Sequence, residues 1–276
     1  MKKIACHLFI LLCTLSILYT SCTSVAAEEY ILSMPPTVSL EQVASMLTPL
    51  ASRLSQETGN NIKLLTAKNI DHYTAEVLHG NIVIGYENPS VYVNTSNVHE
   101  ALASAVTSQH DTLSKGIIIT RPESGISTVE DLKGKKIMIV SRRSVGGFLS
   151  QKLTLQEKGI DIEQDCELSQ AADHQEENVI ISVSIGDVDA GFIKESSLHK
   201  ADKYIAPGSV ISVVKTAPLP NWVISVSRNM PDIQKDELRQ ALLGLSPEDP
   251  ALKALGITAF ERAVDTDYDV IRNILE

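Results

Sequence analysis

Residues 134–149, which read GKKIMIVSRRSVGGFL, decide the fold class. The first half contains an apolar run at residues 136–141 that predicts a buried strand, and the second half opens a helix near Ser144 that extends to Gly159. Strands that alternate in this way with helices indicate parallel sheet. We therefore predict an α/β fold in which helices flank the sheet.

The same alternation extends along the chain on both sides of this stretch. The predicted strands are residues 30–34, 61–67, 82–84, 116–120, 136–141, 188–192, 210–214 and 222–226. The predicted helices are residues 39–58, 71–79, 89–102, 128–132, 144–159, 174–185, 232–243, 250–255 and 267–275. No long linker or repeat interrupts this order, which favours two lobes joined by crossing strands. In such folds ligands bind at the carboxyl ends of strands.

Composition narrows the choice of partner. The chain has 276 residues with 34 acidic and 24 basic side chains, a net charge of -10, and 43% hydrophobic residues. That hydrophobic content supports a folded core, and the acidic balance argues against nucleic acid as a partner. With only 7 Tyr, 4 Phe and 1 Trp, an aromatic platform for single-stranded nucleic acid is not expected either.

The N-terminus has the layout of an export signal over residues 1–27. Two lysines precede an apolar stretch at residues 8–18, and small residues follow. Two processing sites fit: cleavage after Ala27, or a bacterial lipobox that ends at Cys22 and would make this cysteine the site of lipidation. Because no later segment is apolar enough to span a bilayer, we expect a periplasmic or other extracytoplasmic protein, either soluble or anchored by lipid.

Motifs for catalysis, metals or disulfides are not apparent. Cys6 and Cys13 are lost with the signal, and Cys166 alone remains if Cys22 is lipidated, so neither a disulfide framework nor a zinc site can be built. The sequence contains no nucleophile elbow, no His-Glu-x-x-His motif and no P-loop. We expect no enzyme activity, no metal and no cofactor.

Several segments together resemble the phosphate/phosphite/phosphonate-binding periplasmic proteins, the type II solute-binding components of ABC transporters. They are residues 49–59 (PLASRLSQETG), 124–135 (SGISTVEDLKGK), 144–149 (SVGGFL), 186–191 (GDVDAG) and 265–269 (DTDYD). Their order along the chain makes the set fairly specific, although single pieces are common among solute-binding proteins.

The resemblance implies a two-lobed type II periplasmic-binding-protein fold, with mixed sheets and flanking helices. The lobes would close like a hinge on a small phosphorus oxyanion held in the cleft between them. Residues 28–116 and 216–276 would form the first lobe, and residues 117–215 the second. It implies a small anionic ligand, an ABC permease in the membrane and a monomeric protein. An alternative stays open, in which a degenerate member acts as a sensory or interaction module for a membrane kinase or binds a different small ligand. A third, weaker interpretation is an enzyme on the same scaffold.

The loop before the helix at Ser144 is the main candidate site. A helix N-terminus has unpaired N–H groups and a partial positive charge that accept anions, and Gly146 and Gly147 allow the backbone to approach a ligand. By the resemblance this turn binds phosphate, but Val145 and Gly146 stand where the family usually has hydroxyls. Arg143 and its neighbour Arg142 would compensate as partners of an oxyanion. The alternative is an ordinary capped turn with solvated arginines.

The first lobe supplies further candidates. Tyr73 matches a pocket tyrosine of the family, and Tyr86, Glu87 and Asn88 follow a buried strand and so are expected at the cleft. Glu87 would repel a simple dianion but could hold an ammonium group, as on an aminoalkylphosphonate. The alternatives are a half-buried helix residue for Tyr73 and a solvent-facing carboxylate for Glu87.

Two residues of the second lobe complete the set. His174 matches a family histidine that contacts the oxyanion and would bind it better when protonated. Asp189 ends a strand at the cleft, where the family uses it for ligand or hinge contacts. The alternatives are an exposed histidine at a helix start and a structural cap.

Overall fold

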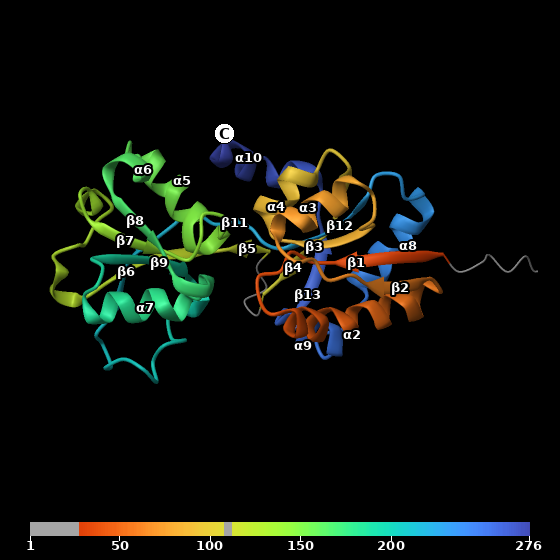
Figure 1. Ribbon diagram of the computed structural model, residues 1–276, viewed down its shortest axis with the longest axis horizontal. Helices are drawn as coiled ribbons and strands as arrows, with labels where there is room; N and C mark the ends of the chain where they lie inside the picture. The colour runs from red at the N-terminus through yellow and green to blue at the C-terminus, as the bar shows by residue number, and fades with distance from the viewer. Residues whose placement is uncertain (1–27, 108–111) are drawn as a thin grey trace, which may run out of the picture.

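A computed structural model describes residues 28–107 and 112–276, which form two α/β lobes side by side (Figure 1). The predicted signal at residues 1–27, with the processing sites at Cys22 and Ala27, lies outside the described residues. Within the described ranges no helix is long and apolar enough to cross a membrane.

The first lobe contains a six-stranded sheet in the order β13-β4-β12-β3-β1-β2. Its strands are β1 (Glu29–Ser33), β2 (Asn61–Leu64), β3 (Ile84–Glu87), β4 (His99–Val106), β12 (Val223–Ser227) and β13 (Ala259–Arg262). β1 runs parallel to both β2 and β3, whereas β12 is antiparallel to β3 and β4, so the sheet is mixed. The returning C-terminal chain therefore lies in the middle of the sheet.

Helices cover both faces of this sheet, as Figure 1 shows. One face carries α2 (Leu40–Thr58), α8 (Asp232–Leu243) and α9 (Pro250–Leu255), and the other carries α3 (Ile70–Leu78) and α4 (Pro89–Thr95). α2 begins and ends where the sequence predicts. Ser39 and Gln42 form a capping box, and Gly59 adopts the left-handed conformation at φ 70° that favours glycine.

The second lobe contains a five-stranded sheet in the order β10-β6-β9-β7-β8. Its strands are β6 (Gly116–Thr120), β7 (Lys136–Ile139), β8 (Glu167–Gln170), β9 (Ala190–Lys194) and β10 (Ile211–Lys215). Its helices are the π-helix η4 (Val145–Leu149), α5 (Ser150–Glu157), α6 (Ile162–Asp165) and α7 (Glu176–Ile185). β7 is parallel to β8 and β9, and β6 is antiparallel to β9 and β10.

Two chain segments cross between the lobes and pair with each other. β5 (Leu113–Ser114) is antiparallel to β11 (Leu219–Pro220). The last helix, α10 (Asp269–Leu275), packs against α4 of the first lobe, but its Ile271 and Ile274 belong to the apolar core of the second. The sequence-based division assigned residues 216–276 to the first lobe, and α10 contacts both lobes.

The structure corrects the prediction of a helix at residues 89–102. The helix α4 ends at Thr95, and the chain then forms β4, which the sequence analysis did not predict. The β4 sequence HEALASAV is rich in helix formers, yet β4 pairs with β12 on one side and β13 on the other. Pairing and burial override local propensity here. The sequence analysis also missed β8, β13 and the two short strands β5 and β11.

Candidate ligand-binding site

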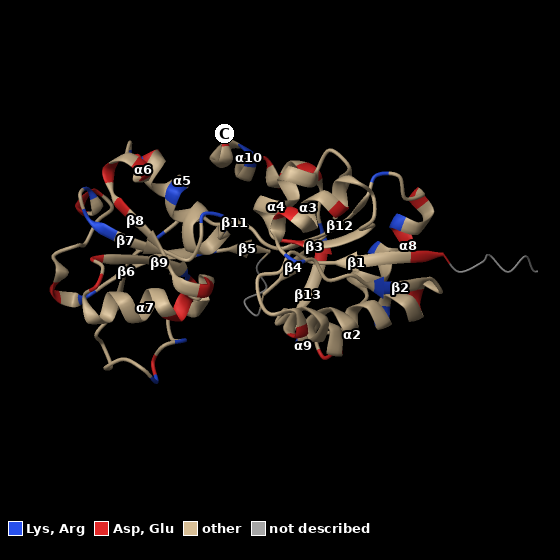
Figure 2. Ribbon diagram, viewed as in Figure 1, with Lys and Arg blue, Asp and Glu red and all other residues tan. Residues whose placement is uncertain are grey.

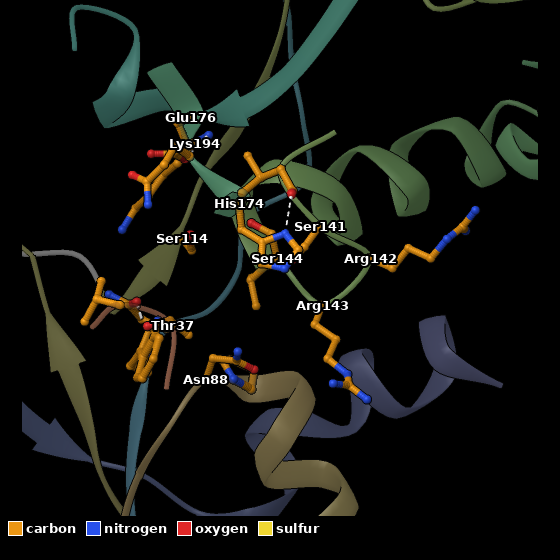
Figure 3. Close-up of a pocket in the computed structure, with 18 of the residues that line it drawn as sticks. Thr37, Asn88, Ser114, Ser141, Arg142, Arg143, Ser144, His174, Glu176 and Lys194 are labelled. Carbon is orange, nitrogen blue, oxygen red and sulfur yellow. Dashed lines mark hydrogen bonds between the residues drawn. The ribbon is translucent and has the colours of Figure 1, made fainter. Parts of the chain in front are cut away.

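A cavity of about 560 Å³ lies between the lobes, with walls from both and from the crossing strands (Figure 3). Six of the residues predicted from the sequence line it: Asn88, Arg143, Ser144, Val145, Gly146 and His174. The others, Tyr73, Tyr86, Glu87, Gly147 and Asp189, are not among its lining residues. The cavity therefore gathers the predicted loop of the second lobe and one helix start of the first.

The wall of the second lobe is the start of the helix that follows β7. Ser144 caps η4, because its Oγ accepts a hydrogen bond from the backbone N–H of Gly147 at 3.0 Å. η4 continues directly into α5, so the helix dipole points its positive end at this wall. The Ser144 hydroxyl donates to no other group in the part of the chain that the structure describes, so it can donate to an anion at this turn.

The two glycines of this turn have different roles. A Cβ on Gly147 would lie 2.6 Å from Cγ2 of Val140, so this glycine is required by packing and does not face the cavity. A Cβ on Gly146 would lie 3.0 Å from Oγ of Ser114 and 3.1 Å from the stem of Lys194, which also line the cavity. Gly146 therefore packs closely against Ser114 and Lys194, and a larger residue here would displace these two side chains of the cavity wall.

The wall of the first lobe is the start of α4. Asn88 caps this helix, and its Oδ1 accepts hydrogen bonds from the backbone N–H of Val91 at 3.0 Å and from Oγ of Ser90 at 2.7 Å. The same Ser90 hydroxyl lies 3.1 Å from the backbone carbonyl of Arg143, so its single proton is shared between the two acceptors. The contact with Arg143 crosses the cleft, so two helix starts from different lobes line the same cavity.

The cavity wall is rich in cations, although the chain as a whole has a net charge of -10. Figure 2 shows acidic positions distributed over both lobes, among them α6 and α8. Among the described residues, the cavity wall instead carries the cations Arg142, Arg143, Lys194 and Lys200 and one carboxylate, Glu176. Focused positive charge of this kind attracts anions.

Most of these cations already have partners. Arg142 pairs with Glu163, and Arg143 lies 3.6 Å from Asp71 across the cleft. Lys200 lies 3.0 Å from the carboxylate of Glu176, which also accepts from Ser197. These pairs reduce what the three side chains offer to a ligand.

Lys194, by contrast, ends β9 with its ammonium unpaired. Within residues 28–107 and 112–276, its Nζ makes no hydrogen bond or ion pair of its own. Burial lowers the pKa of Lys194, the carboxylate of Glu176 opposes this shift, and Lys200 adds to it. A half-buried cation without a partner is destabilising unless an anion reaches it.

His174 lines the cavity in an unusual backbone conformation. Both Asp173 and His174 have positive φ, at 53° and 54°. Residues other than glycine rarely adopt this conformation, and strain of this kind concentrates at functional sites. The ring nitrogen Nδ1 lies 3.2 Å from the carbonyl of Val140, which leaves the Nε2 edge for the cavity.

The structure places Glu87 and Tyr73 away from the cavity, inside the first lobe. Both are fully buried, and the Glu87 carboxylate accepts hydrogen bonds from Tyr73 at 3.0 Å, Thr95 at 3.2 Å and Ser225 at 2.6 Å. Burial raises the pKa of Glu87 to about 6, and the three hydroxyl donors oppose this shift. The expectation that Glu87 faces the cleft is corrected, because its strand end turns the side chain toward these hydroxyls.

Asp189 and Tyr86 also lie apart from the main cavity. Oδ2 of Asp189 accepts from the backbone N–H of Lys136 at 2.9 Å, which is the structural cap that was the alternative for this residue. The Tyr86 ring is buried 5.0 Å from the Trp222 ring and lines a smaller cavity of about 190 Å³.

Sequence reasoning missed several residues of the wall: Thr37, Ser114, Lys194, Asn221 and Trp222. A signal existed for Lys194, because it closely follows the predicted strand at residues 188–192 and so lies at the edge of the sheet where ligands bind. No local signal marked the others, which the crossing segments and the loop after β1 bring to the cleft.

Two α/β lobes joined by crossing strands around a positively charged cleft define a bilobal solute-binding protein. Comparison with known proteins specifies the family. Residues 32–268 match the family described as "ABC transporter, phosphonate, periplasmic substrate-binding protein", and the chain belongs to it. Membership implies a small ligand, a membrane permease as partner and an extracytoplasmic location.

Individual relatives are distant in sequence. The phosphate-import protein PhnD of Mycolicibacterium smegmatis is 22% identical over 90% of this chain and 85% of its own length. Two solved structures each have a TM-score of 0.72 over 90% of this chain. PhnD1 of Prochlorococcus marinus, in complex with methylphosphonate, is 14% identical over 97% of its chain. A Xanthomonas citri protein bound to ATP is 17% identical over 96% of its chain. At these identities the structures show the shared fold.

Proposed function

We propose that this chain is the exported binding component of an ABC transporter and that it binds a phosphorus oxyanion, such as a phosphonate, phosphite or phosphate-like group. One observation carries the proposal: two helix starts from opposite lobes line one cavity together with Lys194, whose ammonium has no partner in the described part of the chain. Helix N-termini and a cation are complementary to a compact oxyanion. The relatives named for phosphate import and solved with methylphosphonate support the same chemistry.

Hinge closure is the proposed mechanism. An anion held between Ser144 on the second lobe and Asn88 on the first contacts both walls and so stabilises the closed arrangement over an open one. The crossing pair of β5 and β11 is the segment about which the lobes would rotate. The closed protein would then dock on its permease.

The finer assignments complete the proposal. We assign residues 28–116 and 216–276 to the first lobe and 117–215 to the second, and we propose a monomer without enzyme activity or a nucleic-acid partner. Export follows the signal at residues 1–27, with cleavage after Ala27 or a lipid anchor on Cys22. The alternative of a sensory module depended in part on Glu87 as an acidic group at the anion site. Glu87 does not line the cavity, so this part of the argument for a sensory role no longer applies.

Calorimetry on the purified protein with phosphate, phosphite, methylphosphonate, 2-aminoethylphosphonate and sulfate tests the proposal. We expect saturable binding of at least one phosphorus anion, followed in parallel by the fluorescence of Trp222, the single tryptophan. A folded sample that binds none of the four phosphorus compounds would refute the assignment and favour a different ligand or a sensory role.

A further inference from the structure

The smaller cavity of about 190 Å³ adjoins the main cleft. Four residues line both spaces: Thr37, Lys194, Asn221 and Trp222. Walls that are shared in this way place the smaller space beside the cleft, and we call it the second chamber. The site therefore has a branch beyond the two helix starts.

The second chamber differs from the cleft in chemistry. Apolar or aromatic side chains make up six of its eleven lining residues: Met34, Met46, Tyr86, Trp222, Leu255 and Ile257. The Trp222 ring packs against Tyr86 at a centroid distance of 5.0 Å and an interplanar angle of 40°. Methionine side chains adapt to irregular apolar groups and contact aromatic rings favourably. This chamber suits an apolar and preferably aromatic group.

Polar groups are arranged at the other end of the site. Asn88, Arg143, Ser144 and His174 line the cleft and do not line the second chamber. Lys194 lies at the junction of the two spaces. An anionic group at the helix starts would therefore lie beside the Lys194 ammonium, and the second chamber would lie on the far side of that ammonium.

The size of the cleft also exceeds the needs of a small anion. Methylphosphonate has five heavy atoms, and five water-sized groups occupy about 150 Å³ at ~30 Å³ each. The cleft alone offers about 560 Å³, which falls within the range of roughly 300–1,000 Å³ for sites that enclose larger organic ligands.

We propose that the ligand of this protein is a phosphorus oxyanion that carries an aromatic substituent, with the oxyanion at the two helix starts and the ring in the second chamber beside Trp222. This inference rests on the proposed function, because it takes the anion site as given and specifies what the anion is attached to. The neighbouring Tyr86 and Trp222 favour an aryl group over an alkyl chain of equal size.

Calorimetry with phenylphosphonate and methylphosphonate on the purified protein tests this inference. We expect phenylphosphonate to bind at least about tenfold more tightly, which corresponds to about 1.4 kcal/mol. Equal affinities, or a preference for methylphosphonate, would overturn the inference and leave the proposed function intact. Binding of neither compound, nor of phosphate or phosphite, would overturn both.

A substitution in the second chamber tests where the aromatic substituent of the ligand lies. Met46 is partly exposed on α2, so Met46→Glu is expected to fold while it places a carboxylate in the second chamber. We expect the preference for phenylphosphonate to fall below about threefold. Leu40→Glu is the matched control, because Leu40 lies on the same helix, is exposed and lines neither space. If the preference survives in Met46→Glu, the proposed placement is wrong.

Trp222 gives a readout that requires no variant. A ring beside this single tryptophan should change its fluorescence at saturation, and saturating methylphosphonate should change it less. Identical spectra for the two saturated complexes would contradict a ring in the second chamber, even if a thermal melt shows that Met46→Glu fails to fold.

Discussion

Glu87 and Lys194 occupy equivalent places in the two lobes, yet they have opposite environments. Each is the last residue of a strand beside the cleft, β3 for Glu87 and β9 for Lys194. The Glu87 carboxylate turns inward and is surrounded by three hydroxyl donors, whereas the Lys194 ammonium lines the cavity without a partner among the described residues.

The comparison separates a structural charge from a binding charge. A buried charge whose hydrogen bonds are satisfied contributes to the native structure and has nothing to offer a ligand. A partly buried charge without a partner gains free energy when an oppositely charged ligand arrives. The position at a strand end does not distinguish these two kinds of charge. The hydrogen-bond partners of each charge distinguish them.

Replacement of Glu87 should show the largest effect. Glu87→Ala leaves the hydroxyls of Tyr73 and Ser225 without their acceptor inside the first lobe and creates a cavity. We expect the free energy of unfolding to fall by about 3 kcal/mol, as measured by urea denaturation. Glu57→Ala, at a partly exposed position of α2, is the control and should change it by less than about 0.5 kcal/mol. If Glu87→Ala keeps full stability but loses anion affinity, Glu87 is a binding charge and not a structural one.

Replacement of Lys194 should weaken binding and spare stability. Lys194→Met keeps the apolar stem over Gly146 and removes the charge, so anion affinity should fall by about 10- to 100-fold, or about 2 kcal/mol. Lys200→Met is the control, because Lys200 already pairs with Glu176. Calorimetry with the tightest phosphorus anion checks both, and an equal loss in the two variants would contradict a special role for Lys194.

The pH dependence of stability should reveal the buried carboxylate. The pKa of Glu87 is about 6 in the folded protein against a usual value of 4.5. The folded state therefore binds the proton more tightly, so the associated stability is fully present below pH 4.5 and is lost as the pH rises through 6. From pH 4 to pH 7, the wild type should lose about 2 kcal/mol relative to Glu87→Gln.

A second buried group makes the comparison with Glu87→Gln necessary. Burial lowers the pKa of His99 to about 4 from 6.5, so its contribution is present above pH 6.5 and is lost as the pH falls through 4. His99 lies 2.9 Å from Ser225, which donates to Glu87, and Glu87→Gln keeps an oxygen acceptor for that serine. The surroundings of His99 are therefore similar in the two proteins, and most of its effect cancels in the difference. A difference that stays constant between pH 4 and pH 7 would mean that the carboxylate of Glu87 has an ordinary pKa.

The smallest effect is expected at the exposed ion pair across the cleft. Arg143 and Asp71 are about half and nine-tenths exposed and 3.6 Å apart. Pairs of this kind contribute little, so Arg143→Met should change anion affinity by no more than about threefold, and less in high salt. Arg142→Met is the matched control. A loss as large as that of Lys194→Met would place Arg143 at the ligand.

Much of the architecture was predictable because its signals are local. The capping box at Ser39 and the left-handed Gly59 define both ends of α2, and the apolar runs that became β1, β6, β7 and β9 were visible as such. β4 was not predictable, because its alanines and serines favour a helix and only its two neighbouring strands make it extended.

The candidate site divides in the same way. The turn from Ser144 to Gly147 could be found because a strand, a cap and two glycines are contiguous in the sequence. Lys194 also had a local signal, because it follows a predicted strand. Trp222 and Asn221 could not be assigned to the site from their sequence neighbours, because the cleft joins segments far apart along the chain.

The sequence by itself determined the family, the alternation of strands and helices, and the helix start that can accept an anion, since each depends on residues close together in the chain. Only the tertiary structure decided which charges face the ligand. It turned Glu87 toward the hydroxyls of Tyr73, Thr95 and Ser225 and left Lys194 at the cavity. The physical reason is that burial and hydrogen-bond partners, which fix the function of a charge, are supplied by distant segments.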